Sequence, residues 1–262
     1  SGVDLGGIAV SEAFMELGRL GTDEQKYLPW MQANYVMAAN RQALEYLPEG
    51  ADLDALTYEE LVAWAANIHE ATGVPRFGFP AGPQGLRHRF FQGFLLPSFT
   101  GSTVTRFRSA EAEAAWELFK ELWQHTNPAS TNYGFMQEPL LTGDVWVAFD
   151  HIARLADAFN QRPDDFVAFP APAGPVGRAF MPVLAGVAVP VTAPDMEASL
   201  ALVEYLMQPE TQVATLLATN FYPTVDAPLP EDLPPAARAL GPAINTMTSS
   251  PDALPALLPV GL

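Results

Sequence analysis

The sequence lacks cysteine, is poor in basic residues and contains no long apolar run. Without cysteine, the chain forms no disulfide, no thiolate nucleophile and no cysteine-bound metal site. Its 13 Lys and Arg residues stand against 30 Asp and Glu residues, and the net charge of −17 opposes binding to nucleic acid or to an anionic membrane. No stretch approaches the roughly 18 uninterrupted apolar residues of a membrane span. We therefore expect no nucleic-acid partner.

The composition is that of a globular protein rich in loops. Hydrophobic residues make up 49% of the 262 residues, enough for one large core or two modest ones. The 25 prolines are more than average usage and indicate many loops. Residues 1–8 have neither the basic region nor the apolar core of a signal peptide, so we expect that the sequence includes none.

Catalytic motifs are also missing. The sequence shows no nucleophile elbow, no phosphate-binding glycine loop and no calcium loop, and we expect no metal ion and no cofactor. A carboxylate pair for glycoside hydrolysis forms only in three dimensions, so a carbohydrate-active enzyme remains an alternative. Four histidines are scattered without the spacing of a metalloprotease helix: His69, His88, His125 and His151.

Several helices have clear signals in the sequence. Residues 57–60 form a capping box, which predicts a helix that ends near Gly73. Ser109 is expected to cap a helix that continues to His125. A further helix is expected over residues 5–20. The helical spacing of three tryptophans predicts that they belong to the core: Trp64, Trp116 and Trp123.

Apolar segments without helical periodicity predict buried strands. Residues 27–40 are expected to form one strand that crosses between two lobes. Residues 145–149 are expected to form another, which places Asp150 and His151 at its carboxyl end, where ligands bind in open α/β sheets. Residues 180–190 read as a buried strand containing Gly186, and two helices and the loop 220–224 follow it.

Taken in order, four segments resemble bacterial extracellular solute-binding proteins, the sugar-capturing receptors of ABC importers. They are Leu28-Pro29-Trp30, Thr57-Tyr58-Glu59-Glu60-Leu61, Gly143-Asp144-Val145-Trp146-Val147 and residues 193–212. The resemblance extends from about Tyr27 to about Val225. Each motif is degenerate, and their joint order carries the specificity.

The resemblance implies an α/β fold of the two-lobed, periplasmic-binding-protein-like kind (type II), whose lobes close around a solute. Before the first of these segments the family has a strand-helix-strand region of roughly a hundred residues, whereas only residues 1–26 precede Tyr27 here. The first lobe is therefore expected to be incomplete in this chain, with the missing N-terminal segment elsewhere in a longer protein or supplied as a separate chain. The expected organisation is residues 1–35 for part of the first lobe and the first hinge strand, 36–165 for the second lobe, 166–225 for the return to the first lobe, and 226–262 for a C-terminal loop and short helix.

Sugar sites combine aromatic platforms with amide and carboxylate groups. Trp30 and Asp150 have other readings, because Trp30 also fits a core position and Asp150 also fits a helix cap with Arg154 as its ion-pair partner. Gly186 is a candidate because it allows a close approach to the backbone. The predicted ligand-binding residues are Trp30, Gln32, Asn34, His88, Phe91, Asp150, His151, Gly186, Asn220 and Tyr222.

The resemblance thus implies an exported receptor, periplasmic or at the cell surface, that binds a carbohydrate and delivers it to the membrane subunits of an ABC importer. Two alternatives stay open at this point. One is a carbohydrate-active enzyme of the glycoside hydrolase kind, and the other is an incomplete lobe that acts as an interaction module.

Overall fold

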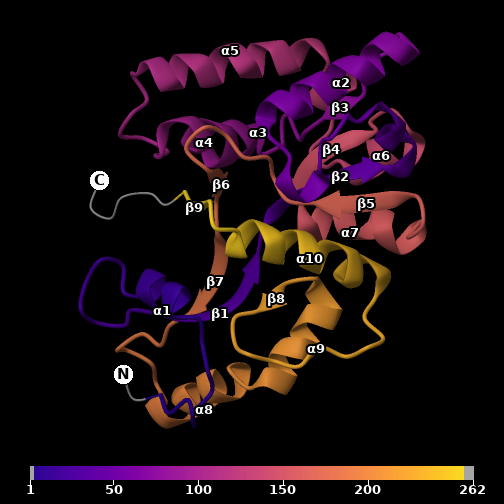
Figure 1. Cartoon of the computed structure of the whole chain (residues 1–262). Helices are drawn as coiled ribbons and strands as arrows, with labels where there is room; N and C mark the ends of the chain where they lie inside the picture. Colours follow the sequence, from indigo (N-terminus) through magenta and orange to yellow (C-terminus); the bar gives the residue numbers. More distant parts are fainter. Residues whose placement is uncertain (1–2, 257–262) are drawn as a thin grey trace. The chain divides into compact units, whose positions relative to one another are not determined.

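A computed structural model describes residues 3–256 of the chain (Figure 1). The chain divides into two compact units, which we describe separately. Within the described range, unit 1 comprises residues 3–33 and 183–237, and unit 2 comprises residues 34–182 and 238–256. The chain therefore passes between the units after Ala33, after Pro182 and after Ala237.

Unit 2 is built on a four-stranded sheet in the order β3-β4-β2-β5. Strand β2 (Tyr35–Asn40) lies between β4 (Val147–His151) and β5 (Phe166–Phe169) and is antiparallel to both, while β3 (Phe77–Gly78) is parallel to β4. All residues of β2 except its last are buried. A strand covered on both faces requires a continuous apolar segment, which explains the lack of alternation in this part of the sequence.

Two long helices of unit 2 begin at the predicted caps. In α2 (Tyr58–Thr72), the Thr57 hydroxyl accepts the Glu60 N–H at 3.2 Å and the Glu60 carboxylate accepts the Thr57 N–H at 2.8 Å, so the capping box is confirmed. In α5 (Ala110–Gln124), Ser109 accepts the N–H of Ala112 at 3.1 Å. The unit also contains α6 (Gln137–Thr142), α7 (Ile152–Gln161), most of α10 (Pro235–Ser249), the parallel pair β6 (Arg178–Phe180) and β9 (Ala253–Pro255), and 3-10 turns at Arg41–Tyr46, Leu53–Ala55 and Pro128–Asn132.

A continuous helical segment of unit 2 changes its winding part-way. Helix α3 (Arg87–Phe90) leads into a π-helical segment (Phe91–Leu95) and then into α4 (Leu96–Thr100). A Cβ atom on Gly93 would lie 2.8 Å from Met181 Cε, so glycine permits this segment to approach the chain just beyond β6. Such π-helical turns are common near functional sites.

Unit 1 contains a three-stranded sheet in the order β7-β1-β8. Strand β1 (Leu28–Ala33) is antiparallel to β7 (Val183–Val187) and to β8 (Tyr222–Pro223), with an irregularity in the β7 register between Pro29 and Met31. The other elements are α1 (Glu12–Gly18), α8 (Met196–Leu206) and α9 (Pro209–Thr219). Its core cluster consists of Leu28, Val203, Met207 and Val225.

The structure differs from several expectations. The helix expected over residues 5–20 is limited to α1, because Gly6 and Gly7 adopt positive φ angles of 56° and 85°. The strand expected over residues 27–40 is two strands separated by Asn34. The return to the first lobe, expected at residue 166, falls at Val183 in the division into units, because β5 pairs with β2.

The tryptophans of α5 correct another expectation. Trp64 is fully buried, as predicted, but Trp116 and Trp123 are 45% and 44% exposed. The inner face of α5 is formed instead by Ala112, Ala115 and Leu122. Small residues let the helix lie close to its neighbours, and the bulky rings remain at its edges. No helix within residues 3–256 has the length and apolar character needed to cross a membrane.

Candidate functional site

Asp150 belongs to the hydrogen-bonded scaffold at the end of β4. It is fully buried, and its two oxygens accept the backbone N–H groups of His151 at 2.7 Å and Met136 at 2.8 Å. Burial raises the pKa of Asp150 to about 7, although the two backbone donors and Arg154, 3.5 Å away, oppose the rise. Because both oxygens are engaged within the protein, a positioning role fits Asp150 better than the direct solute contact expected from the sequence.

His151, and not Asp150, caps α7. Its Nδ1 accepts the N–H of Ala153 at 3.2 Å and makes His151 the N-cap of α7. Burial, and then the charge of Arg154, lower the pKa of His151 to about 4. A neutral imidazole whose Nδ1 accepts a hydrogen bond carries its proton on Nε2. Its ring lies edge-on to Tyr35, with centroids 5.1 Å apart.

Asn34 lies beside this cluster and has an unsatisfied acceptor. It is 2% exposed, and its backbone carbonyl accepts the N–H of Ile152 at 3.0 Å. Its side-chain Oδ1 is buried and has no hydrogen-bond partner. Buried carbonyl oxygens are nearly always paired, so this atom marks a place where a bound molecule would gain a hydrogen bond.

Unit 2 also contains residues that were not among the predicted ligand-binding residues. Arg154 lies 4.7 Å above the ring of Phe135, which is 46% exposed, and donates to the Gly134 carbonyl at 3.4 Å. Arg89 donates to the sulfur of Met181. Tyr35 faces His151 across the β2 and β4 pair. These residues come from segments far apart in sequence, and no local motif indicates that they meet.

His88 and Phe91 line a second feature of unit 2, an aromatic pocket of about 370 Å³. Phe91 and Trp116 have ring centroids 3.9 Å apart, which links the π-helical segment to α5. His88 is exposed at the rim and Phe91 is 8% exposed. The pocket is lined by Phe79, His88, Phe91, Gln92, Leu96, Thr103, Phe107, Trp116 and Phe119. Of the predicted residues, the structure brings these two together here and Asn34, Asp150 and His151 together at the end of the sheet.

In unit 1, Trp30 and Gln32 point from β1 at alternate positions. Trp30 is half-buried at the irregular point of the strand, and its Nε1 is buried without a hydrogen-bond partner. Gln32 donates from Nε2 to the Pro223 carbonyl at 3.1 Å and stands opposite Tyr222 in the sheet. Trp30 therefore has an unsatisfied donor, whereas the amide of Gln32 already ties β1 to β8.

The other predicted residues of unit 1 have structural partners. A Cβ on Gly186 would lie 2.2 Å from the Tyr27 ring, so glycine makes room for that ring and not for open space. Asn220 ends α9 in the left-handed conformation, with φ 60°. The Tyr222 hydroxyl donates to the Ala237 carbonyl at 2.7 Å, and burial raises the pKa of this hydroxyl.

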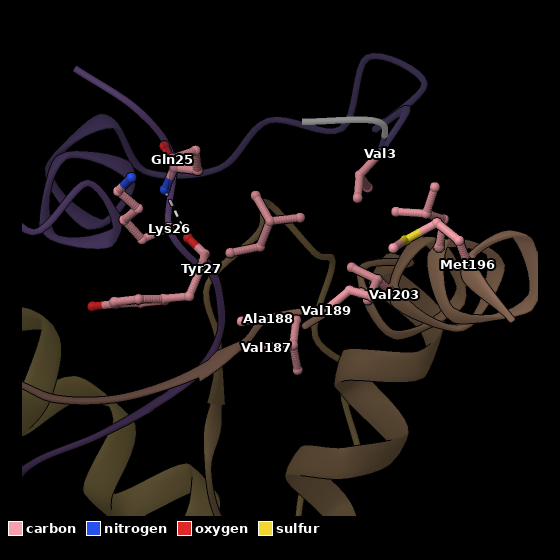
Figure 2. A pocket seen from close by; sticks show the side chains of 11 residues that line it. Val3, Gln25, Lys26, Tyr27, Val187, Ala188, Val189, Met196 and Val203 are labelled. Carbon is pink, nitrogen blue, oxygen red and sulfur yellow. Dashed lines mark hydrogen bonds between the residues drawn. The ribbon is translucent and has the colours of Figure 1, made fainter. Parts of the chain in front are cut away.

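Unit 1 also contains a largely apolar pocket of about 230 Å³ (Figure 2). Val3, Met196 and Val203 line it from the N-terminal segment and α8, and Val187 and Val189 line it from the end of β7. The Gln25 amide donates to the Tyr27 carbonyl at 2.8 Å beside it (Figure 2). None of the predicted site residues lines this pocket. Within residues 3–256, no group of three or more His, Asp or Glu side chains is placed to hold a metal ion.

Comparison with known proteins gives a family for this architecture. The family model described as bacterial extracellular solute-binding protein matches residues 7–237. The chain belongs to this family. The family consists of non-enzymatic receptors, which agrees with the expectation that the chain is not an enzyme. No curated protein sequence matches the chain.

Solved structures show the same fold at low sequence identity. Maltose-bound MalE3 of T. maritima is 20% identical with a TM-score of 0.72, and the alignment covers 95% of this chain and 66% of MalE3. A chitin oligosaccharide binding protein is 16% identical with a TM-score of 0.70, at coverages of 89% and 63%. UgpB from Mycobacterium tuberculosis, in complex with glycerophosphocholine, is 16% identical with a TM-score of 0.66, at coverages of 96% and 62%. The chain thus spans less than two thirds of each of these structures.

Proposed function

We propose that the protein is a periplasmic or cell-surface receptor that captures a carbohydrate by lobe closure and delivers it to an ABC importer. The observation that carries this proposal is the presence of two unsatisfied polar atoms, one in each unit. Trp30 Nε1 in unit 1 and Asn34 Oδ1 in unit 2 are both buried without hydrogen-bond partners. A sugar hydroxyl both donates and accepts, so hydroxyl groups complement both kinds of atom.

The aromatic side chains of unit 2 support a carbohydrate as the solute. Phe135 is 46% exposed next to Arg154, and Phe107 and Trp116 are exposed at the rim of the aromatic pocket. Rings of this kind pack against the apolar C–H faces of sugars. The related structures named for maltose and for chitin oligosaccharide favour the same class of solute.

Capture follows from differential affinity. A solute that contacts both lobes stabilises the closed state more than the open one, and closure then reports to the importer that solute is present. In this proposal Trp30 and Asn34 supply the unsatisfied polar atoms that the solute contacts. Asp150 acts indirectly, by fixing the backbone of His151.

A thermal-shift screen of the purified chain tests the proposal. Neutral mono-, di- and oligosaccharides are compared with amino acids, polyamines and phosphate. We expect one sugar class to raise the melting temperature by several degrees, increasingly with concentration. Trp30→Phe removes the N–H together with part of the ring and should weaken binding by about 1–3 kcal/mol. Trp146→Phe, the same replacement outside the proposed site, serves as the control. Turnover of a sugar without a binding shift would support an enzyme instead.

A second proposal concerns the part of the family's length that this chain does not span. We propose that a polypeptide supplying that part, in the same protein or as a separate chain, packs on unit 1. The support is the three-stranded sheet of this unit and the exposure of apolar side chains on α8, where Leu202 is 57% and Tyr205 63% exposed. Hydrogen exchange with and without such a partner should show protection confined to unit 1. Protection that appears only in unit 2 would contradict this assignment.

A further inference from the structure

The end of the unit 2 sheet carries positive charge in a strongly acidic protein. The whole chain has a net charge of −17. At the point where β2 begins and β4 ends, however, Arg154 lies 3.5 Å from Asp150, and the Tyr35 ring packs edge-on against Phe94 of the π-helical segment that follows Arg89. The charges of Arg154 and Arg89 both act on this tyrosine. Charges farther away than about 8 Å are largely screened at physiological salt. The charges of the nearby residues, and not the net charge of the chain, therefore decide which solutes this end of the sheet binds.

Arg89 has donors that the protein leaves unused. Its guanidinium donates to the sulfur of Met181, which is a weak acceptor. Its Nε is buried and has no hydrogen-bond partner. It forms no ion pair with a carboxylate among residues 3–256. A partly buried guanidinium without an acceptor is costly, so this position calls for an anion or another strong acceptor.

Arg154 is held beside Asp150 and Gly134 by weak contacts. Its Nη1 lies 3.5 Å from Asp150 Oδ1 and 3.4 Å from the Gly134 carbonyl, both longer than a good charge-assisted hydrogen bond. Its side chain is 23% exposed, over the ring of Phe135. The Asp150 oxygens are shared with two backbone N–H groups, which leaves Arg154 only part of their charge.

Tyr35 links the two arginines. Burial raises the pKa of its hydroxyl, and the positive charges of Arg154 and then Arg89 oppose that rise, so both cations act on this one group. The hydroxyl has no hydrogen-bond partner among the described residues, and the His151 ring lies edge-on to the Tyr35 ring. A neutral hydroxyl donor on which two guanidinium charges act is a suitable partner for an anion.

We propose that Arg89, Arg154 and the Tyr35 hydroxyl bind an anionic group, a carboxylate or a phosphate, carried by the sugar that the receptor captures. The inference rests on the proposed function and names its solute more closely, as an acidic sugar. The buried acceptor of Asn34 is left for a hydroxyl group of the same solute. Sequence composition alone argues against such a solute, and the inference comes from the local arrangement of residues.

Isothermal titration of the purified chain tests the inference. The probes are maltose as a neutral sugar, galacturonate and digalacturonate as carboxylates, glucose 6-phosphate as a phosphate, and inorganic phosphate alone. We expect an acidic sugar to bind more tightly than maltose, with an affinity that falls as salt is raised. Comparison of the carboxylate and phosphate probes identifies the anion.

Variants assign the effect to the arginines. Arg89→Gln should weaken binding of the acidic sugar at least about 30-fold, because it removes one partner of a desolvated charge pair, and Arg89→Lys should recover only part of the loss because the fork of donors is missing. Arg41→Gln, an exposed arginine at the opposite end of β2, is the matched control and should bind like the parent. Melting curves of each variant separate binding from folding.

The possible results distinguish the two proposals. Tight binding of maltose, with no preference for acidic sugars and no effect of Arg89→Gln, would overturn the anionic inference and leave the carbohydrate receptor intact. If inorganic phosphate binds as tightly as glucose 6-phosphate, the chain has an anion site without a sugar site. That result would overturn the inference. Absence of binding by all sugars, neutral and acidic, would count against the proposed function itself.

Discussion

The Nδ1 atoms of His69 and His125 lie 3.1 Å apart, where α2 meets the end of α5. One hydrogen bond between these atoms needs one protonated and one unprotonated nitrogen, and a second proton would place two positive charges side by side. Burial, and then the charge of His69, lower the pKa of His125 from its ordinary 6.5. The unfolded chain therefore binds this proton more readily than the folded chain. Stability is lost as pH falls below about 6.5.

We predict that in His125→Asn the free energy of unfolding falls less as pH is lowered than it does in the parent. The effect should be below about 1 kcal/mol, because the pair is partly exposed. Urea unfolding between about pH 7.5 and about pH 5 measures it. Parallel profiles for the parent and His125→Asn would show that the pair does not respond to protons.

Asp150→Asn should destabilise the protein by about 2–4 kcal/mol. The amide has only one acceptor oxygen, whereas the carboxylate accepts N–H groups from Met136 and His151. One of these buried donors would lose its partner and face an NH₂ group. Thermal or urea unfolding measures the loss. Asp144→Asn, at an exposed carboxylate of the same segment, should stay within about 0.5 kcal/mol of the parent.

Asp150 and His151 are predicted to have opposite effects on how the free energy of unfolding changes with pH. The pKa of Asp150 is raised from 3.8 to about 7, so the folded chain holds the extra proton and this contribution to stability is lost as pH rises from about 4 to about 7. The pKa of His151 is lowered from 6.5 to about 4, so its contribution is lost as pH falls through the same range.

Removing Asp150 should therefore expose the acid sensitivity of His151. In Asp150→Asn, the free energy of unfolding is expected to fall more steeply between about pH 6.5 and about pH 4 than in the parent. Urea unfolding at several pH values, with Asp144→Asn as the reference, checks the slope. Equal slopes in the parent, Asp150→Asn and Asp144→Asn would show that Asp150 and His151 do not offset each other.

Gly186→Ala is predicted to cost about 1–3 kcal/mol. The new Cβ would lie 2.2 Å from Tyr27 Cδ2, so the ring or the strand must move. Tyr27→Ala in the same chain should relieve this clash, which a double-mutant cycle would detect. Gly134→Ala, whose Cβ would meet neighbours at an ordinary 3.7 Å, is the control.

Trp64 and Trp116 are predicted to differ in both stability and accessibility. Trp64→Ala should cost about 3–5 kcal/mol because the side chain is fully buried, with Nε1 donating to the Ala43 carbonyl at 2.7 Å. Trp116→Ala should cost less, because 45% of that residue is exposed. Fluorescence quenching should fall more on removal of Trp116 than on removal of Trp64. Equal quenching losses would contradict the exposed position of Trp116.

The elements best predicted from sequence are those fixed by local bonds. The caps of α2 and α5 depend on residues three positions apart, and both form as expected. The position of Asp150 and His151 at the end of β4 is also confirmed, because strand length and the following helix determine it. The predicted extents of the helix over residues 5–20 and of the strand through Asn34 were wrong, because the positive-φ glycines Gly6 and Gly7 and a change of unit interrupt them.

The chemistry at the end of the sheet could not be predicted in the same way. Whether Asp150 contacts solute or backbone depends on Met136, fourteen residues earlier in the chain. The charge of Arg89 acts on Tyr35 from a different element of unit 2, and no spacing in the sequence encodes this effect. Trp116 has helical spacing suited to a core, but the alanines beside it define the inner face of α5.

The π-helical segment Phe91–Leu95 determines which way the side chains of α3 point around the helix axis, relative to those of α4. Loss of one residue from this wide turn would convert it to ordinary α-helix and rotate α3 by about 100° relative to α4. His88 would then leave the aromatic pocket and Arg89 would turn away from Met181, although neither residue had changed. A single-codon deletion at Gln92 would thus alter the surface of unit 2 more than most substitutions could, and insertions and deletions within this turn offer a simple route by which related chains could acquire different solutes.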